Sequence, residues 1–178
     1  MRRTAVQDVR AFAELLTDGG ERAATLDAVA ARAGVSKGGL LYHFPSRDAL
    51  VEGLTAHLRE LTEADVAVMR AAPAGPVDHL LRTSTDTDGE LEVVYLAVSR
   101  LAQGAYPRAR AALDDAHDAW VEAVAEEVGD PTVARAVVLL SDGLYARTAL
   151  GAGGPRVTDA ELDELVALVR TLAAARRS

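Results

Sequence analysis

Apolar residues recur along most of the chain at the three- and four-residue spacing of an amphipathic helix, and the alternation typical of strands is absent. The first such stripe comprises Val6, Val9, Phe12, Ala13 and Leu16. Glycine and proline interrupt the pattern at wide intervals, as they do between helices. The sequence therefore predicts an all-α protein with nine helices, at residues 3–18, 26–33, 37–43, 47–72, 77–83, 88–105, 107–129, 131–150 and 159–175.

Side chains suited to capping stand at many of these helix starts. Short polar side chains accept hydrogen bonds from the first free backbone N–H groups, and a glutamate three residues later returns one. The predicted caps are Thr25, Ser36, Ser46, Asp130 and the pairs Thr87 with Glu90 and Thr158 with Glu161. The run Gly151–Pro155 lacks the Gly-Lys-Ser/Thr ending of a phosphate loop and is interpreted as a connector.

Composition narrows the class of protein. The chain has 178 residues and no cysteine, which excludes disulfides, thiolate metal sites and cysteine nucleophiles. With 49% hydrophobic residues it can bury a sizeable core. The N-terminus MRRTAVQDVRAFAELL has charges within its apolar stretch and is not interpreted as a signal peptide. No uncharged run approaches the ~20 residues of a membrane span. We expect a soluble, cytoplasmic protein with no membrane partner.

The net charge of −8 hides an uneven distribution. Residues 1–48 carry a local net charge of +1, and residues 49–178 carry −9. Because local charge governs contact with phosphates, the acidic total does not exclude DNA binding by the N-terminal part.

The segment Thr25–Leu50 reads TLDAVAARAGVSKGGLLYHFPSRDAL. Two short predicted helices are joined there by Ala33-Gly34-Val35-Ser36, in which Gly34 permits a left-handed turn and Ser36 caps the next helix. This is the spacing of a helix-turn-helix, whose second helix enters the major groove of DNA.

These residues resemble the TetR family of repressors over residues 5–54. The resemblance rests on a Phe-bearing first helix, Gly19-Gly20, the A-x-T-L-D-x-V-A start of the second helix, A-G-V-S-K-G, and L-x-Y-H-F-P-S-R-D-A-L. It implies a DNA-binding domain at residues 1–46 and a ligand-binding and dimerisation domain at residues 47–178. Gly39 stands where the family often has Thr, and Leu41 where it often has Tyr, so the operator sequence is not readable.

Physical arguments support several DNA contacts within this segment. Gly38 and Gly39 let backbone N–H groups approach a phosphate at a helix N-terminus, and Tyr42 and His43 join apolar bodies to polar tips. The resemblance implies contacts by Lys37 and by Arg47. The candidate DNA-binding residues are Arg3, Thr25, Ser36, Lys37, Gly38, Gly39, Leu41, Tyr42, His43 and Arg47.

Each of these residues also has a plainer interpretation. Gly38-Gly39 would then be a simple loop, Lys37 a solvated charge, and His43 a structural side chain. Leu41 either contacts a thymine methyl or belongs to the core, and Phe44 is expected in the core.

The C-terminal part offers apolar helix faces that carry a few polar groups, as an effector cavity between bundle helices requires. The candidate ligand-binding residues are His57, His79, Tyr95, Ser99, His117, Trp120 and Tyr145. For each of them, ordinary core packing is the alternative. Asp114-x-x-His117 is one isolated pair, so we expect no metal site, and we expect no cofactor.

The last two predicted helices carry wide apolar stripes, which favours a homodimer that pairs them as a four-helix bundle. The candidate interface residues are Val133, Val137, Leu140, Leu144, Thr148, Leu162, Leu165, Val166 and Val169.

The sequence thus favours a homodimeric repressor of a palindromic DNA operator, released by a small molecule that the sequence does not identify. A small helical ligand carrier or enzyme is the alternative, but no nucleophile–base pair or cofactor loop supports it, and we expect no catalysis. A DNA-binding module whose C-terminal domain only dimerises is a third possibility.

Overall fold

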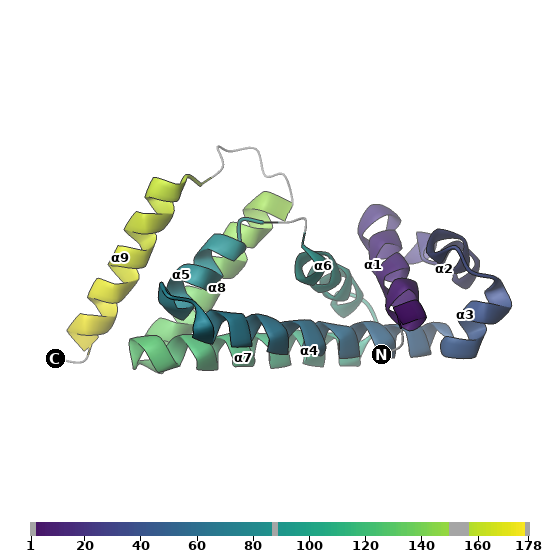
Figure 1. Ribbon diagram of the computed structural model, residues 1–178, viewed down its shortest axis with the longest axis horizontal. Helices are drawn as coiled ribbons and strands as arrows, with labels where there is room; N and C mark the ends of the chain where they lie inside the picture. The colour runs from purple at the N-terminus through teal and green to yellow at the C-terminus, as the bar shows by residue number, and fades with distance from the viewer. Residues whose placement is uncertain (1–2, 87–88, 150–156, 177–178) are drawn as a thin grey trace. The chain divides into compact units, whose positions relative to one another are not determined.

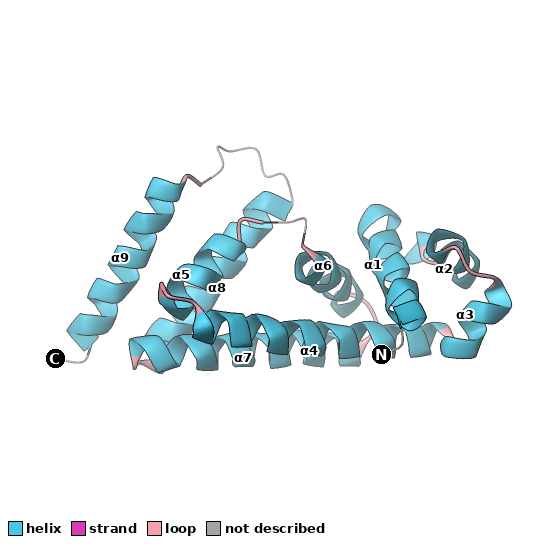
Figure 2. Ribbon diagram, viewed as in Figure 1, coloured by secondary structure: helices cyan, strands magenta, loops and turns pink. Residues whose placement is uncertain are grey.

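The computed structural model describes residues 3–86, 89–149 and 157–176, which form nine α-helices and no strand (Figures 1 and 2). This confirms the predicted all-α class. The helices are α1 (Arg3–Ala23), α2 (Leu26–Ala33), α3 (Lys37–His43), α4 (Arg47–Ala71), α5 (Gly75–Thr83), α6 (Glu90–Ala102), α7 (Pro107–Val128), α8 (Pro131–Ala149) and α9 (Asp159–Arg176).

The helices pack as two compact units. Unit 1 takes in the described residues of Met1–Thr62 and Gly89–Ala116, and unit 2 those of Glu63–Asp88 and His117–Ser178. Helices α4 and α7 contribute residues to both units. These packing units do not test the predicted boundary between a DNA-binding domain at residues 1–46 and a ligand-binding domain at residues 47–178, which stays a prediction.

Helix α1 differs from its predicted end at Asp18. The helix is assigned to Ala23, but Gly20 has φ 70° and ψ −172°, so a kink interrupts it within the Gly19-Gly20 pair that the sequence marks as a break. A positive φ is easy only for glycine, which explains why the regular helix stops there. The last residues of α1 form a separate short turn beyond the kink.

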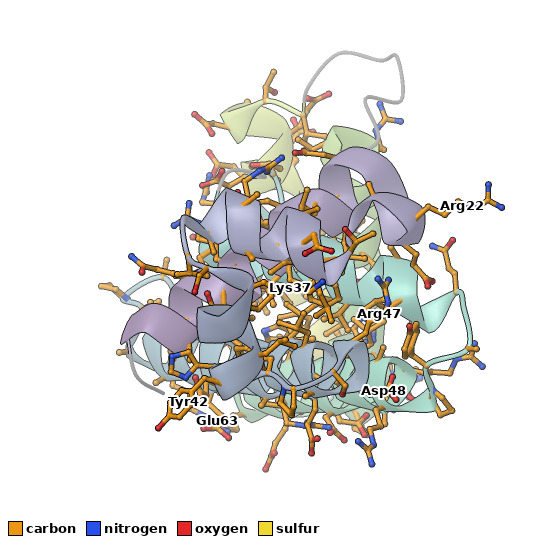
Figure 3. The ribbon with its side chains drawn as sticks, turned by 90° about the vertical axis from the view of Figure 1, so that its right-hand side faces the viewer. Arg22, Lys37, Tyr42, Arg47, Asp48 and Glu63 are labelled. Carbon is orange, nitrogen blue, oxygen red and sulfur yellow. The ribbon has the colours of Figure 1, made fainter. Side chains whose placement is uncertain are left out.

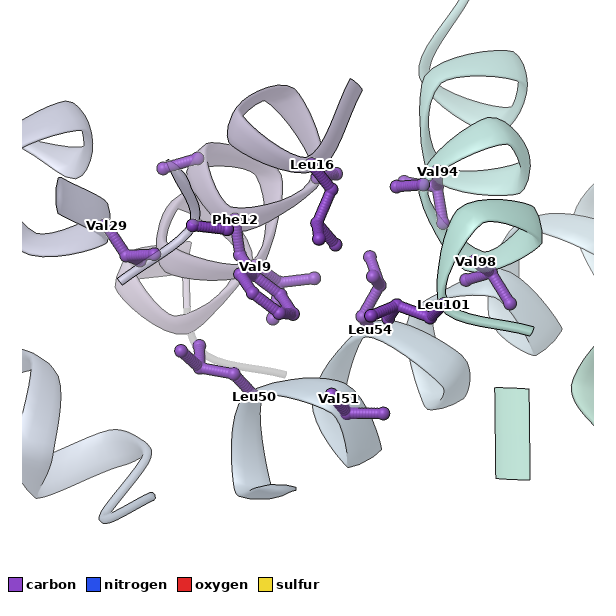
Figure 4. Packing of buried hydrophobic residues seen from close by; sticks show 14 of the residues in the cluster. Val9, Phe12, Leu16, Val29, Leu50, Val51, Leu54, Val94, Val98 and Leu101 are labelled. Carbon is purple, nitrogen blue, oxygen red and sulfur yellow. The ribbon is translucent and has the colours of Figure 1, made fainter. Parts of the chain in front are cut away.

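The core of unit 1 lies between α1, α4 and α6 (Figure 4). Four of the five residues of the predicted α1 stripe, Val9, Phe12, Ala13 and Leu16, are fully buried, and Val6 is half-buried. They pack with Leu50, Val51, Leu54, Val94, Val98 and Leu101. Each buried large apolar side chain contributes about 1.5–3 kcal/mol, so this cluster fixes α6 against the N-terminal helices.

The core of unit 2 is built from α5, α8 and α9, together with the second half of α7. Helix α5 contributes Val77, Leu80 and Leu81, and α9 contributes Leu162, Val166 and Val169. A buried hydrogen bond of 2.6 Å joins the hydroxyls of Ser84 and Ser141, so two polar groups inside this core are satisfied.

Most predicted caps are confirmed. The side chains of Thr25, Ser36, Ser46 and Asp130 accept hydrogen bonds from backbone N–H groups of the helices that follow them. Thr158 and Glu161 form a complete capping box. At α6 the prediction was wrong in its N-cap position, which Gly89 occupies without a side-chain bond. Thr87, Asp88 and the connector Gly151–Pro155 lie outside the described residues.

Among the helices of the described chain, none is both long and apolar enough to cross a membrane.

Candidate nucleic-acid interface

The turn between α2 and α3 has the geometry that the sequence predicts for a helix-turn-helix. Gly34 ends α2 with φ 69° and ψ 28°, and its N–H bonds back to the carbonyls of Ala30 and Ala31. The N–H of Val35 also donates to Ala30 O at 3.0 Å. Two residues later, Ser36 Oγ accepts from Gly39 N at 3.0 Å and starts α3. The left-handed glycine and the serine cap thus fix the direction of α3.

Helix α3 is anchored to the core by Leu40, which is fully buried. Lys37, Gly38, Gly39 and Tyr42 are exposed, and 80% of the surface of Tyr42 is accessible. A large aromatic side chain with this exposure is accessible to a binding partner. We call the exposed set Lys37, Gly38, Gly39 and Tyr42 the α3 surface (Figure 3).

The partly buried residues of α3 flank this surface. Leu41 and His43 are each half-buried, so both interpretations of Leu41 stay open. The rings of Tyr42 and His43 meet edge to face with centroids 5.3 Å apart. Phe44 is buried, as expected, and its ring packs over Gly53, where an added Cβ would lie 2.6 Å from Phe44 Cε1.

Lys37 has an acidic neighbour within the helix-turn-helix. Its Nζ lies 3.0 Å from the carboxylate of Asp27, and both side chains are more than half exposed. An ion pair in water is worth only ~0–1 kcal/mol, so a DNA phosphate can compete for the ammonium group. The contact with Asp27 therefore restrains the Lys37 side chain but leaves its ammonium group able to contact a phosphate.

Arg47 lies inside a network that sequence reasoning did not foresee. Its guanidinium donates to Tyr106 Oη at 3.0 Å, to Ala24 O at 2.6 Å and to Glu21 O at 3.1 Å. It also stacks over the Phe12 ring at 5.6 Å. The structure shows Arg47 joining the end of α1 to the α6–α7 turn, while its phosphate contact stays a prediction.

Three further residues near the helix-turn-helix are Thr25, Arg3 and Arg22. Thr25 caps α2 and is exposed, and the side chain of Arg3 lies outside the described part. Arg22, which was not among the sequence candidates, is an exposed cation close to the start of α2 (Figure 3). The only sequence signal for it would have been its place beside the glycine pair.

The candidate effector residues are divided between the two units. In unit 1, His57 is buried and hydrogen-bonds to Glu90 at 3.0 Å, and Ser99 donates to the backbone of Tyr95. In unit 2, Asp65 accepts from Trp120 Nε1 at 2.9 Å and hydrogen-bonds to His79 at 3.0 Å.

The other unit 2 candidates lie close to this group. The rings of His117 and Trp120 are 5.9 Å apart, His117 hydrogen-bonds to Asp142 at 3.2 Å, and Tyr145 is half-buried. The sequence analysis did not predict Asp65 and Asp142 as members of this group, because no motif in the neighbouring sequence marks them. The structure thus brings together His79, His117 and Trp120 around two aspartates.

A surface cavity of about 300 Å³ lies in unit 1, at the α6–α7 turn. It is lined by Gly104, Ala105, Tyr106, Pro107, Arg110, Ala111 and Asp114. None of the seven effector candidates lines it. Within the described residues, no group of three or more potential metal ligands comes together.

The candidate interface residues of α8 and α9 are largely used inside unit 2. Val133, Val137, Leu144, Leu162, Val166 and Val169 are buried, and Leu140, Thr148 and Leu165 are half-buried. The large apolar side chains left exposed on these helices are Leu139 at 64%, Leu168 at 64% and Leu172 at 48%. The stripe is wide, as predicted, but its exposed edge consists of other residues.

The fold and the turn geometry define a helix-turn-helix transcription regulator. Residues 9–54 match the family model described as bacterial regulatory proteins, tetR family. Residues 9–54 therefore carry a helix-turn-helix of the TetR type, and the remaining helices are outside the matched segment. A comparison with curated protein sequences finds no match.

Solved structures resemble the chain over nearly its whole length. A TetR-family transcriptional regulator from Rhodococcus sp. is 21% identical with a TM-score of 0.70, and the match covers 96% of this chain and 98% of that chain. A transcriptional regulator from Saccharomonospora viridis, in complex with choline, is 21% identical with a TM-score of 0.67, covering 96% and 95%. The multidrug binding protein EbrR, complexed with malachite green, is 25% identical with a TM-score of 0.67, covering 97% and 98%.

Proposed function

We propose that this regulator is a repressor that binds a palindromic DNA operator as a homodimer and is released by a small molecule. The observation that carries the proposal is the α3 surface, which combines a cation, two glycines at a helix N-terminus and a strongly exposed tyrosine. Each of these groups suits a phosphate or a base edge. The proposed contacts are those predicted from the sequence, with Arg22 added.

Dimerisation is proposed through the exposed edge of α8 and α9. Leu165, Leu168, Leu172 and Ala175 follow one another at helical spacing on α9, and Leu139 lies on α8, which packs against α9. Exposed apolar residues of this size are typical of an interface. A two-fold dimer would present two α3 helices to two half-sites, as recognition of a palindrome requires.

Effector binding is proposed around Trp120 in unit 2. Two of the similar structures were solved with small molecules, choline and malachite green, each bound to its own protein. In this chain, Trp120, His79 and His117 supply aromatic and polar groups next to Asp65 and Asp142. If effector and operator favour different conformations, each lowers the affinity for the other by the same factor.

The test is selection of bound duplexes from a random-sequence pool by the purified protein, followed by sequencing. We expect a palindromic consensus, and binding to the selected duplex that weakens steeply with added salt because phosphate contacts release counterions. Lys37→Ala should bind the selected duplex at least tenfold more weakly, whereas Arg59→Ala, an exposed arginine paired with Asp115, should bind normally. Recovery of no enriched sequence would overturn the proposal.

A further inference from the structure

The cavity at the turn between α6 and α7 is not used by the proposed function. Its volume is about 300 Å³, and all the residues that line it lie within residues 104–114, inside unit 1. This volume is at the lower end of the range of ~300–1,000 Å³ for ligand sites, so the cavity suits a molecule smaller than a typical drug. The site is separate from the group around Trp120, which belongs to unit 2.

Two hydrogen bonds hold the larger side chains of the cavity wall in place. A guanidinium nitrogen of Arg110 donates to the carbonyl of Ala102, the last residue of α6, at 3.0 Å. Tyr106 Oη accepts from Arg47 Nε at 3.0 Å. Because these bonds restrain Arg110 and Tyr106 in the absence of a ligand, less conformational entropy is lost when a ligand binds.

Arg110 and Asp114 place opposite charges one helical turn apart on the wall of the cavity. Side chains at positions i and i+4 are neighbours on a helix, ~5–6 Å apart at Cβ, but a base that precedes its acid makes the weaker pair. Arg110 is bonded to Ala102 instead. Within the described part of the chain, Asp114 has neither a hydrogen bond nor an ion pair. The wall therefore offers unused guanidinium donors and an unpaired carboxylate together.

The rest of the lining is small or apolar. Ala105, Pro107 and Ala111 contribute apolar surface beside the ring of Tyr106, and Gly104 contributes no side chain. A site with mostly apolar walls and a few fixed polar groups selects its ligand by the charges at those groups.

We propose that this cavity binds a small zwitterion, an α-amino acid with an apolar side chain. The ligand carboxylate accepts hydrogen bonds from Arg110, its ammonium group donates to Asp114, and its side chain packs against Pro107 and Ala111. A simple anion is repelled by Asp114 and a simple cation by Arg110, so only a ligand with both charges is favoured by both groups. Because the site needs no DNA, the inference goes beyond the proposed function and does not depend on it.

The test is isothermal titration calorimetry of the full-length protein with L-leucine, L-valine and L-phenylalanine. We expect saturable binding of at least one of them with a Kd of about 1 mM or tighter, the range for so small a ligand. For L-leucine, isopentylamine lacks the carboxylate and 4-methylpentanoate lacks the ammonium group. If L-leucine binds, each of these two analogues should bind at least tenfold more weakly.

Variants locate the binding site for whichever amino acid binds. Arg110→Gln and Asp114→Asn should each weaken binding at least tenfold, and Ala111→Phe, which fills the cavity from an exposed position, should abolish it. The controls are Arg108→Gln and Asp118→Asn, which remove the same charges at exposed positions of α7 outside the cavity and should bind as the wild type does.

The inference is overturned if none of the three amino acids binds up to about 10 mM, ten times the expected Kd. It is also overturned if an analogue with a single charge binds as tightly as L-leucine, or if Ala111→Phe binds normally. If Ala111→Phe does not fold, as judged by circular dichroism, Arg110→Gln and Asp114→Asn decide. None of these outcomes alters the selection of DNA duplexes that tests the proposed function.

Discussion

Helices α3 and α9 both expose large apolar side chains, but in different surroundings. On α3, Tyr42 stands among Lys37 and two glycines, and the sequence of this short helix contains no acidic residue. On α9, Leu168 and Leu172 continue an apolar stripe on a helix that begins with Asp159 and Glu161. The first surroundings suit a polyanion, and the second suit an apolar partner such as another copy of the same helix. Charge on the neighbouring residues thus separates two kinds of binding surface that exposure alone would group together.

The largest expected effect comes from placing a charge on the α9 stripe. Leu168→Glu should split the dimer, because a carboxylate would be buried against apolar side chains in the interface. We expect a monomer in sedimentation equilibrium at micromolar concentration. Operator affinity should fall about 100-fold or more, since truncation or charge at the centre of an interface commonly costs ~2–4 kcal/mol.

The matched control is Ala167→Glu, which adds the same charge at an exposed position on another flank of α9. It should remain dimeric. A wild-type protein that is itself a monomer at micromolar concentration would contradict the assignment of the α9 stripe to a dimer interface.

Removing the charge from the α3 surface should have the next largest effect. Lys37→Ala is expected to weaken operator binding about 10- to 100-fold, the range of ~1–3 kcal/mol for a lost specific contact, with an unchanged melting temperature. If Lys37 touches a phosphate, the slope of log affinity against log salt should fall by about one. Unaltered affinity in fluorescence anisotropy would remove Lys37 from the interface.

Replacing the buried Asp8, whose carboxylate has no hydrogen-bond partner among the described residues, with an apolar residue should raise the free energy of unfolding. Burial raises the pKa of Asp8, so the folded state binds this proton more tightly than the unfolded state does. Wild-type stability from this group is therefore present below the ordinary pKa of 3.8 and is lost as pH rises through the raised value. Asp8→Leu should be about 1–3 kcal/mol more stable at pH 7, the range for relieving a buried unsatisfied group.

Urea denaturation at pH 7 and at pH 4 checks this expectation. The gain from Asp8→Leu should shrink at the lower pH. A gain that is equal at both values would assign it to packing and not to the carboxyl group.

Removing the hydrogen bond between Arg47 and Tyr106 should have a smaller effect on stability. Tyr106→Phe removes the oxygen that accepts from Arg47 Nε and should destabilise the protein by about 0.5–1.5 kcal/mol. Tyr42→Phe is the control, because its ring is exposed and its hydroxyl has no described partner in the core. Equal unfolding midpoints for the two variants would show that the Arg47 network does not depend on Tyr106.

Sequence reasoning succeeded where the determining interactions are local. The turn at Gly34 and the caps at Ser36 and Asp130 depend on residues a few positions apart, so the helix starts could be predicted. The inward bonds of Arg47 could not, because Tyr106 and Arg47 are 59 residues apart in the chain. The same applies to Asp65, whose partners come from other helices.

The predicted dimer interface stays a prediction, and the structure shows what periodicity leaves out. Periodicity shows that α8 and α9 have wide apolar faces, but it does not show which part the protomer covers by itself. Helix α5 packs on both of them and takes up much of the predicted interface. Leu139, Leu168 and Leu172 stay exposed on these two helices, which is why we propose them for the interface.

The smallest effect expected is at Asp27, the acidic neighbour of Lys37. Asp27→Asn removes the ion pair of 3.0 Å and frees the lysine ammonium for phosphate. Because exposed ion pairs are worth only about 0.2–1 kcal/mol, affinity for a random-sequence duplex should rise no more than about fivefold. The gain should disappear above 0.5 M salt, where the Debye length falls below ~5 Å. Asp48→Asn, which adds the same charge change in the first turn of α4, separates the local effect on Lys37 from the general loss of a negative charge. If both variants gain equally, Asp27 acts through net charge alone. A gain confined to Asp27→Asn shows that this acid lowers the affinity of the α3 surface for DNA by pairing with Lys37.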